Sequence, residues 1–117
     1  MKQYNIPVEA SLDVIGGKWK VVILCHLMKG KKRTSELKKL MPNITQKMLT
    51  QQLKELQEDN IVNREVYNQV PPKVEYSLTE YGWTLKEALD MLCSWGEQHI
   101  EQKYPNKDEV LLAPVEI

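Results

Sequence analysis

The sequence predicts a mainly α-helical fold with one small β-ribbon, and three observations lead to it. Two short helical patterns, over residues 34–41 and 45–58, are joined by the break Pro42-Asn43-Ile44. Two short strand patterns, over residues 61–67 and 74–78, then flank a proline-containing loop. Further helical patterns lie before and after this block. Helix, turn, helix and two-stranded ribbon in that order are the outline of a winged helix-turn-helix, here with helices at both ends.

Two helices are predicted before this block. The first opens near Pro7, which suits an early helical position because its missing N–H costs nothing there, and Gly16-Gly17 end it. Its apolar stripe consists of Val8, Leu12 and Ile15. The second helix spans residues 18–29, is apolar on most sides and is therefore expected to be largely buried, with Gly30 as its end.

The helix predicted over residues 45–58 has two faces of different chemistry. Its apolar stripe consists of Leu49, Leu53 and Leu56, at spacings of four and three. The opposite face carries Gln46, Lys47, Thr50, Gln51 and Lys54. Amides, ammonium groups and hydroxyls are the groups that contact base edges and phosphates, and carboxylates appear only at the far end, at Glu55 and Glu58. An ordinary solvated amphipathic helix is the alternative interpretation.

The ribbon is predicted to alternate along its two strands. Val62, Arg64 and Val66 share one face of the first strand, and Ile61, Asn63 and Glu65 share the other. The apolar face of the return strand consists of Val74, Tyr76 and Leu78. Pro71-Pro72 hold the tip extended, which lowers the entropy lost on docking to DNA. Arg64, Gln69 and Lys73 are then candidates for backbone contact, while Glu65 and Glu75 favour the alternative of a plain surface hairpin.

A long C-terminal helix is predicted over residues 80–104, with either Ser77 or Thr79 as its cap, since Ser77 and Glu80 fit a capping box. Its stripe consists of Leu85, Leu89, Leu92, Trp95 (or Gly96) and His99, which recur at spacings of three or four. Such a stripe beyond the DNA-binding unit favours a dimer interface, and an intramolecular core is the competing interpretation. Residues 105–117 lack a clear period and are interpreted as an ordered arm or a loose tail after a single domain over residues 1–104.

Charge is balanced over the whole chain and uneven along it. The 16 basic and 16 acidic residues give a net charge of zero. Residues 1–75 hold 13 basic and 8 acidic side chains, a net of +5, and residues 76–117 hold 3 basic and 8 acidic, a net of −5. Phosphate contact needs a local positive face rather than a positive molecule, so this division favours DNA contact by the helix-turn-helix and wing. Uneven scatter of charge is the alternative.

Other kinds of site have little support in the sequence. His26 and His99 are isolated, Cys25 lies in an apolar helix and is expected to be an inert thiol, and no spacing suits a zinc site or a phosphate loop. No apolar run approaches the ~20 residues of a membrane span, and no signal peptide is evident. We therefore expect a cytoplasmic protein without metal, cofactor or enzyme activity.

Four segments carry a family resemblance. They are residues 7–20 (PVEASLDVIGGKWK), 32–37 (KRTSEL), 45–53 (TQKMLTQQL) and 70–79 (VPPKVEYSLT). In this order they resemble the HxlR-type family of bacterial winged-helix transcriptional regulators, and the similarity covers residues 4–100. The resemblance implies a dimeric DNA-binding regulator related to the MarR-like winged helices. Many members carry a redox-sensing cysteine just before the first segment, where this chain has Ile6, so that function is not carried over.

The expectation is a homodimeric transcription factor, by default a repressor, that binds a pseudo-palindromic operator in double-stranded DNA. The DNA-contacting candidates are Lys32, Arg33, Thr45, Gln46, Lys47, Thr50, Gln51, Lys54, Arg64, Gln69 and Lys73. The dimer candidates are Val8, Leu12, Leu85, Leu89, Leu92 and Trp95. Two alternatives stay open: a winged helix used as a protein-interaction module, and a thiol-based sensor acting through Cys25 or Cys93. A small-molecule or redox effector is left open as well.

Overall fold

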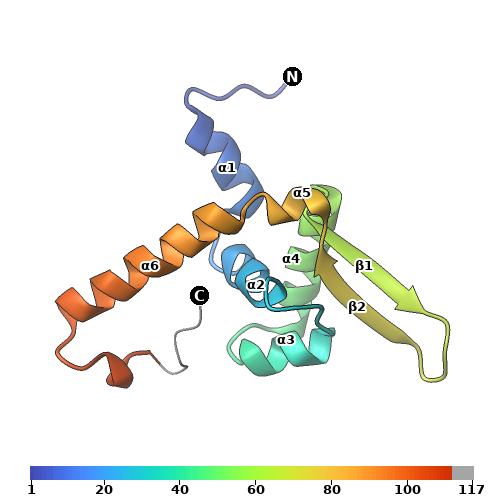
Figure 1. Ribbon diagram of the computed structural model, residues 1–117. Coiled ribbons are helices and arrows are strands. Elements are labelled where there is room, and N and C mark those ends of the chain that lie inside the picture. The colour runs from blue at the N-terminus through green and yellow to red at the C-terminus, as the bar shows by residue number, and fades with distance from the viewer. Residues whose placement is uncertain (112–117) are drawn as a thin grey trace. The chain divides into compact units, whose positions relative to one another are not determined.

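The computed structural model describes residues 1–111 of the chain (Figure 1). The chain divides into two compact units, Met1–Thr84 and Leu85–Ile117, each of which is described by itself. In the first unit the elements are α1 (Pro7–Ile15), α2 (Lys20–Leu27), α3 (Thr34–Leu40), α4 (Gln46–Glu58), β1 (Val62–Tyr67), β2 (Lys73–Leu78) and α5 (Glu80–Trp83). In the second unit they are α6 (Lys86–Lys103) and the short 3-10 helix η1 (Lys107–Glu109).

The first two helices keep close to their predicted limits. α1 begins at Pro7 and ends at Ile15, and the N–H of its C-cap, Gly16, donates to the carbonyl of Leu12 at 2.8 Å. None of its residues is buried within the chain. α2 begins two residues later and ends two residues earlier than predicted, because Gly17 adopts a positive φ of 94° before it and Met28 caps it. Ile23, Leu24 and Leu27 of α2 are buried in the core.

The helix-turn-helix is α3 and α4, as predicted. The Arg33 N–H donates to the Glu36 carboxylate at 2.9 Å at the start of α3. The Thr45 hydroxyl accepts the Met48 N–H at 3.0 Å, which makes Thr45 the N-cap of α4 rather than its first residue. After α4 the chain turns through Asn60, which takes a left-handed φ of 60°. The core residues contributed by α2, α3, α4 and the turn between α3 and α4 are Ile23, Leu24, Leu27, Leu37, Met41, Ile44, Leu49, Leu53 and Leu56.

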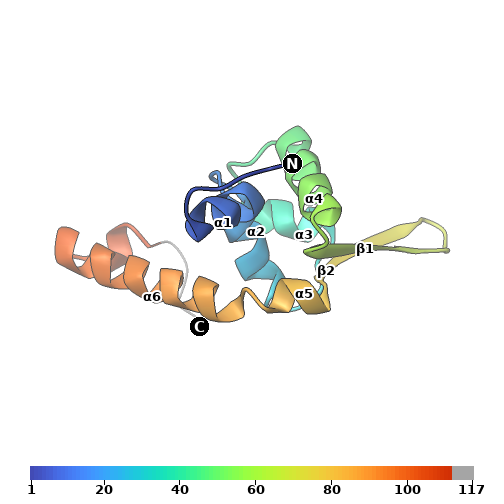
Figure 2. The same ribbon diagram turned by 90° about the horizontal axis from the view of Figure 1, so that it is seen from above.

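The wing is a two-stranded antiparallel ribbon that extends away from α3 and α4 (Figure 2). Val62 pairs with Leu78, Arg64 with Tyr76 and Val66 with Val74, so the alternation predicted for both strands is confirmed. A contact that the sequence did not predict joins the segment before α3 to this ribbon. Lys32 and Tyr76 exchange two backbone hydrogen bonds, of 3.0 and 2.8 Å, so the entrance to the helix-turn-helix is bonded to the base of the wing.

The prediction of a single helix over residues 80–104 is wrong, because the chain forms two helices there. α5 ends at Trp83, Thr84 and Leu85 form a turn, and α6 begins at Lys86. The hydroxyl and the backbone N–H of Thr84 both donate to the Tyr81 carbonyl, at 2.5 and 3.1 Å, in place of the continuing helical bond. Ser77 lies within β2, so the cap of α5 is Thr79, whose hydroxyl accepts the Gly82 N–H at 2.7 Å.

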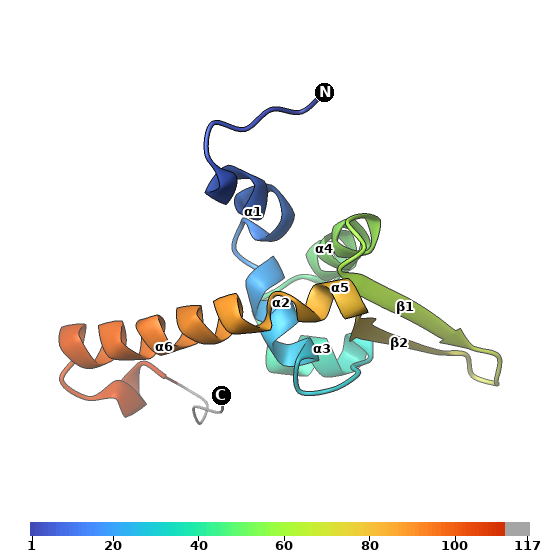
Figure 3. The ribbon, with the colours of Figure 1, turned by 45° about the horizontal axis from the view of Figure 1, so that its top comes forward.

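The cap of α5 fixes this short helix to the turn between α4 and β1, beside which α5 lies in Figure 3. The Thr79 hydroxyl lies 2.8 Å from the carbonyl oxygen of Asn60 and 3.2 Å from that of Ile61. The Thr79 N–H also donates to Ile61, at 3.0 Å. Gly82 lies so close to this carbonyl that a Cβ on it would be 2.2 Å from the Ile61 oxygen. Glycine is therefore required here by a close approach of two backbone segments.

The second unit consists of α6 and the segment after it. Trp95 and His99 stack on one face of α6 with ring centroids 5.2 Å apart. The Lys107 ammonium in η1 pairs with Glu97 at 3.2 Å and with Glu101 at 3.4 Å. The arm or tail predicted over residues 105–117 thus begins with an ion-paired turn, and its last six residues lie outside the described part. Through residue 111, no helix has the length and apolarity needed to cross a membrane.

Candidate nucleic-acid interface

The outer face of α4 has the two-sided character expected of a recognition helix. Leu49, Leu53 and Leu56 are fully buried, so the inward stripe is confirmed. The side chains on the opposite face are all exposed: Gln46, Lys47, Thr50, Gln51 and Lys54. Because packing fixes the inner stripe, the outer residues are presented on a rigid element rather than on a mobile loop. Two amides, one hydroxyl and two ammonium groups therefore form one polar, cationic surface.

Hydrogen bonds order part of this surface. The Gln46 Nε2 donates to the Thr50 hydroxyl at 3.4 Å, one turn further along the helix. The Gln51 Nε2 donates to the Glu55 carboxylate at 2.8 Å, again one turn along. Both glutamines thus have an oriented side chain before any ligand binds, which lowers the entropy lost on recognition.

Glu55 is held by a lysine that sequence reasoning missed. The Lys20 ammonium of α2 lies 2.7 Å from the Glu55 carboxylate, and Lys20 is only 6% exposed. The Lys20 hydrogen bond, and secondly that of Gln51, hold the pKa of the Glu55 carboxyl below its ordinary value. The carboxylate on the outer side of α4 is therefore neutralised by an internal cation. A lysine at the start of the largely apolar helix α2 was the signal for this pair in the sequence.

The wing presents its own polar groups. Arg64 and Gln69 are exposed, as a backbone-contacting role requires. The Lys73 ammonium is shared: it lies 4.8 Å from the Tyr67 ring centroid and 3.7 Å from the Glu75 carboxylate. A hydrogen bond to Glu75, followed by burial and the charge of nearby Glu65, raises the pKa of Tyr67 to about 12.

The two acidic residues that argued against the wing are both paired with lysines. Glu75 faces Lys73, and Glu65 lies 3.6 Å from the Lys31 ammonium. Such exposed pairs add little stability, but each one lowers the negative potential that a phosphate backbone would meet. Glu65 and Glu75 therefore repel a phosphate backbone less than two unpaired carboxylates would.

The remaining candidates lie at the start of α3 and of α4. Arg33 is exposed immediately before α3. Lys32 contributes its backbone to the bridge with Tyr76, and its ammonium lies 3.3 Å from the Gly30 carbonyl. Thr45 uses its hydroxyl as the α4 cap, so its part in this surface is to fix the first turn of α4. The structure thus gives Lys32 and Thr45 positioning contacts in addition to the roles expected from sequence.

Each unit has one helix on which predicted dimer residues are exposed, α1 in the first unit and α6 in the second. On α1, Val8 is 52% and Leu12 61% exposed. On α6, Leu92 is 53% and Trp95 66% exposed, whereas Leu89 is fully buried and Leu85 is half-buried. The stripe predicted for α6 therefore divides into buried and exposed members. Met91, which is 73% exposed and four residues before Trp95, was missed because the predicted stripe reached Trp95 through Leu92 instead.

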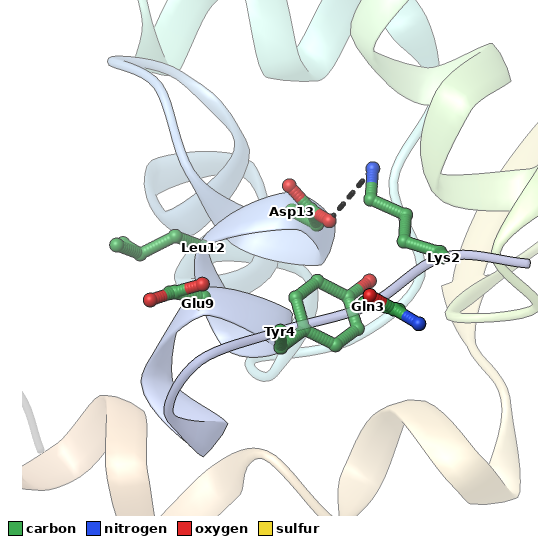
Figure 4. Close-up of a pocket in the computed structure, with 6 residues that line it drawn as sticks. All are labelled: Lys2, Gln3, Tyr4, Glu9, Leu12 and Asp13. Carbon is green, nitrogen blue, oxygen red and sulfur yellow. Dashed lines mark ion pairs between the residues drawn. The ribbon is translucent and has the colours of Figure 1, made fainter.

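An open pocket beside α1 is lined mostly by residues of polar or charged type. Its volume is about 360 Å³, and it is lined by Lys2, Gln3, Tyr4, Glu9, Leu12 and Asp13 (Figure 4). The Lys2 ammonium pairs with the Asp13 carboxylate at 2.9 Å and, together with the Tyr4 hydroxyl, holds the pKa of Asp13 below its ordinary value. All six lining residues are at the surface except for a half-buried Glu9. Within residues 1–111, no cluster of histidine, cysteine and carboxylate side chains could hold a metal ion.

Comparison with known proteins adds a family to this geometry. Residues 14–104 match the HxlR-like helix-turn-helix family. The uncharacterized HTH-type transcriptional regulator YtcD of Bacillus subtilis (strain 168) is 70% identical over 110 residues, which cover 94% of this chain and 87% of that protein. A crystal structure of YtcD has a TM-score of 0.79 at 71% identity, covering 82% of this chain and 98% of that one. The redox regulator HypR in its oxidized form has a TM-score of 0.78 at 58% identity, covering 80% of this chain and 96% of that one.

Proposed function

This chain belongs to the family of HxlR-like helix-turn-helix transcriptional regulators, and from that premise we propose that it represses transcription as a homodimer bound to a pseudo-palindromic operator. Members of the family are DNA-binding regulators and not enzymes. The observation that carries the proposal is the outer face of α4, where five exposed polar or cationic side chains lie opposite three fully buried leucines. Repression by a bound dimer requires only that it occupy DNA that the polymerase needs.

In this proposal α4 enters the major groove and reads bases. Gln46 and Gln51 offer amide groups to base edges, and Thr50 offers a hydroxyl and a methyl. Lys47 and Lys54 reach guanine or phosphate, and the remaining contacts to the backbone come from Arg33 and Lys32 before α3 and from Arg64, Gln69 and Lys73 in the wing. The neutralised wing carboxylates support this arrangement because they leave the ribbon without an uncompensated acidic face.

The homodimer rests on the exposed apolar side chains of α1 and α6. Val8, Leu12, Leu92 and Trp95 are each more than half exposed in the single chain, which is costly for side chains of this size. Burial against a second copy removes that surface from water. A two-fold dimer presents two copies of α4 about 34 Å apart along the DNA, which is why the operator is expected to be a pseudo-palindrome.

Fluorescence anisotropy against DNA from the upstream region of the gene, with a scrambled duplex beside it, tests the DNA contacts. Selective binding that weakens with salt is expected, and Lys47→Ala and Arg64→Ala should each lower the salt slope by about 0.9. Lys103→Ala, an exposed lysine on α6 outside the proposed surface, serves as the control and should leave the slope unchanged. Selective binding that neither site substitution alters would refute the residue assignment. The absence of DNA binding even at low salt would favour a protein-interaction module instead.

Repression and the dimer require their own measurements. Transcription in vitro from the bound promoter should fall as the protein is added, and a rise would show an activator. Sedimentation equilibrium should give a dimer for the wild type and a shift toward monomer for Leu92→Ala and Trp95→Ala. Gln102→Ala, which removes an exposed polar side chain from the same helix, is the control. A monomer for the wild type, or a dimer that all three variants retain, would contradict the proposed interface.

Redox sensing is a second candidate, because the comparison includes the redox regulator HypR at 58% identity. Here the sensor would be Cys25, which is half-buried in α2, or Cys93, which is exposed on α6. Diamide should then weaken DNA binding, reductant should restore it, and the matching Cys→Ser variant should be insensitive. DNA affinity that is equal before and after oxidation would exclude this candidate, in agreement with the isoleucine at position 6.

A further inference from the structure

Gln51 of α4 is the outer end of a chain of three side chains that begins inside the protein. The Lys20 ammonium, from α2, lies 2.7 Å from one oxygen of the Glu55 carboxylate. The other oxygen of that carboxylate accepts a hydrogen bond from the Gln51 Nε2, at 2.8 Å. Lys20 is 6% exposed, whereas Gln51 lies on the exposed face of α4. This Lys20–Glu55–Gln51 chain therefore connects a buried, fixed cation to a side chain that faces solvent.

The chemistry of the middle member decides which way the Gln51 amide points. Hydrogen bonds from Lys20 and then Gln51, together with the Lys20 charge, hold the pKa of Glu55 below its ordinary value, so the carboxyl is ionised at neutral pH. An ionised carboxylate only accepts hydrogen bonds. Gln51 must therefore turn its NH₂ toward Glu55, and this leaves its carbonyl oxygen and one remaining N–H available to a ligand. A glutamine without such a partner could present either end of its amide.

We propose that Lys20 and Glu55 are positioning residues that make Gln51 a reader of bases with a hydrogen-bond donor in the major groove. Adenine presents its N6 amino group there and cytosine presents its N4 amino group, so both can donate to the Gln51 carbonyl. Guanine and thymine present no donor on that edge, so they leave the Gln51 carbonyl without a partner. This inference rests on the proposed function, in which α4 lies in the major groove.

The buried lysine is needed for this arrangement to hold near DNA. A free carboxylate at Glu55 would be repelled by the phosphate backbone and would turn away from it, releasing Gln51. Pairing with Lys20 neutralises that charge. It also fixes the carboxylate, through the oxygen atom that Gln51 does not contact. Because Lys20 belongs to a buried helix, the orientation of Gln51 is set by the core rather than by the surface.

Selection of bound duplexes from a randomised DNA library, followed by sequencing, tests the inference because it measures base preference at every position of the half-site. The full-length chain is compared with Gln51→Ala, Glu55→Ala and Lys20→Met. The control is Glu58→Ala, which removes a carboxylate from the same end of α4 at an exposed position outside the chain of three. Circular dichroism checks that each variant is folded, and Glu55→Ala keeps the test decisive if Lys20→Met does not fold.

The expected wild-type profile has one half-site position where adenine or cytosine is preferred over guanine or thymine, roughly fivefold for a single good contact. Gln51→Ala should abolish the preference at that position. Glu55→Ala, and Lys20→Met if folded, should lower it at the same position and at no other. Glu58→Ala should strengthen binding to all duplexes by lowering repulsion from phosphate, without changing the profile.

Three results would overturn the inference, and each has a distinct meaning. A wild-type chain that selects no sequence would refute the proposed function itself. An unchanged profile for Gln51→Ala would show that Gln51 reads no base, although the protein is a sequence-specific regulator. Loss of the preference in Gln51→Ala together with an unchanged profile in Glu55→Ala would show that Gln51 reads a base without being positioned by the carboxylate.

Discussion

Replacing Gly82 with alanine should destabilise the first unit, because no room exists for the added methyl group. A Cβ at this position would lie 2.2 Å from the carbonyl oxygen of Ile61 and 3.3 Å from the Thr79 hydroxyl. The nearer neighbour is backbone, which cannot turn aside as the end of a flexible side chain can. Relief of the clash requires α5 to move away from the start of the wing, and the Thr79 bonds to Ile61 and Gly82 would lengthen with it.

The size of the effect follows from three contributions. Overpacking of a tight site costs about 1–3 kcal/mol. Loss of the Thr79 cap costs about 1 kcal/mol more. Alanine has a higher helix propensity than glycine, and this offsets about 1 kcal/mol of the loss. We therefore expect the free energy of unfolding to fall by about 1–3 kcal/mol, which corresponds to a decrease in Tm of roughly 4–12 °C for a chain of this size.

Thermal unfolding followed by circular dichroism, at a fixed protomer concentration, measures the change. Gly96→Ala is the matched control, since the same methyl group at Gly96, within α6, would meet no atom within 4 Å. At Gly96 only the higher helix propensity of alanine acts, so the free energy of unfolding should rise by up to about 1 kcal/mol. Equal shifts of the two variants in the same direction, or a Gly82→Ala variant as stable as the wild type, would refute the close approach of α5 to Ile61.

Three further substitutions test separate parts of the structure. Thr79→Val keeps the shape of the side chain but removes the cap hydroxyl, so urea unfolding should show a loss of about 1–2 kcal/mol, while Thr79→Ser should lose less. Leu53→Ala, at a fully buried position, should lower the free energy of unfolding by about 2–5 kcal/mol, whereas Lys54→Ala, at an exposed position, should lower it by under about 0.5 kcal/mol. Similar losses for both variants would contradict the assignment of faces on α4. Burial, and then the charges of Lys32 and Lys29, hold the pKa of His26 below its ordinary value of 6.5. The unfolded chain therefore takes up this proton at a higher pH than the folded chain, and stability should fall as the pH decreases through about 6.5. Urea midpoints over that range should vary less in His26→Gln, and an unchanged pH dependence would show that another group is responsible.

Local patterns in the sequence predicted the helix-turn-helix and the wing closely. The leucine spacing of α4 predicted its buried face, because periodicity alone determines which side chains of a helix share a side. The alternation in β1 and β2 predicted for the same reason which residues share a face of the ribbon, whereas the register came from the structure. The outer residues of α4 could also be read directly, since whatever does not pack inward is presented outward. Their assignment as DNA contacts is still a prediction.

Only the tertiary structure decided the features that depend on residues far apart along the chain. Lys20 and Glu55 are 35 positions apart, and no period in the sequence connects them, so the pair that orients Gln51 could not be predicted. The bond between Lys32 and Tyr76 and the break between α5 and α6 have the same origin. Thr84 could have continued a helix, but the contact of Gly82 and Thr79 with Ile61 fixes α5 against the wing. Local propensity determines where a helix can form, whereas packing against distant residues determines where it ends and how its functional side chains are held.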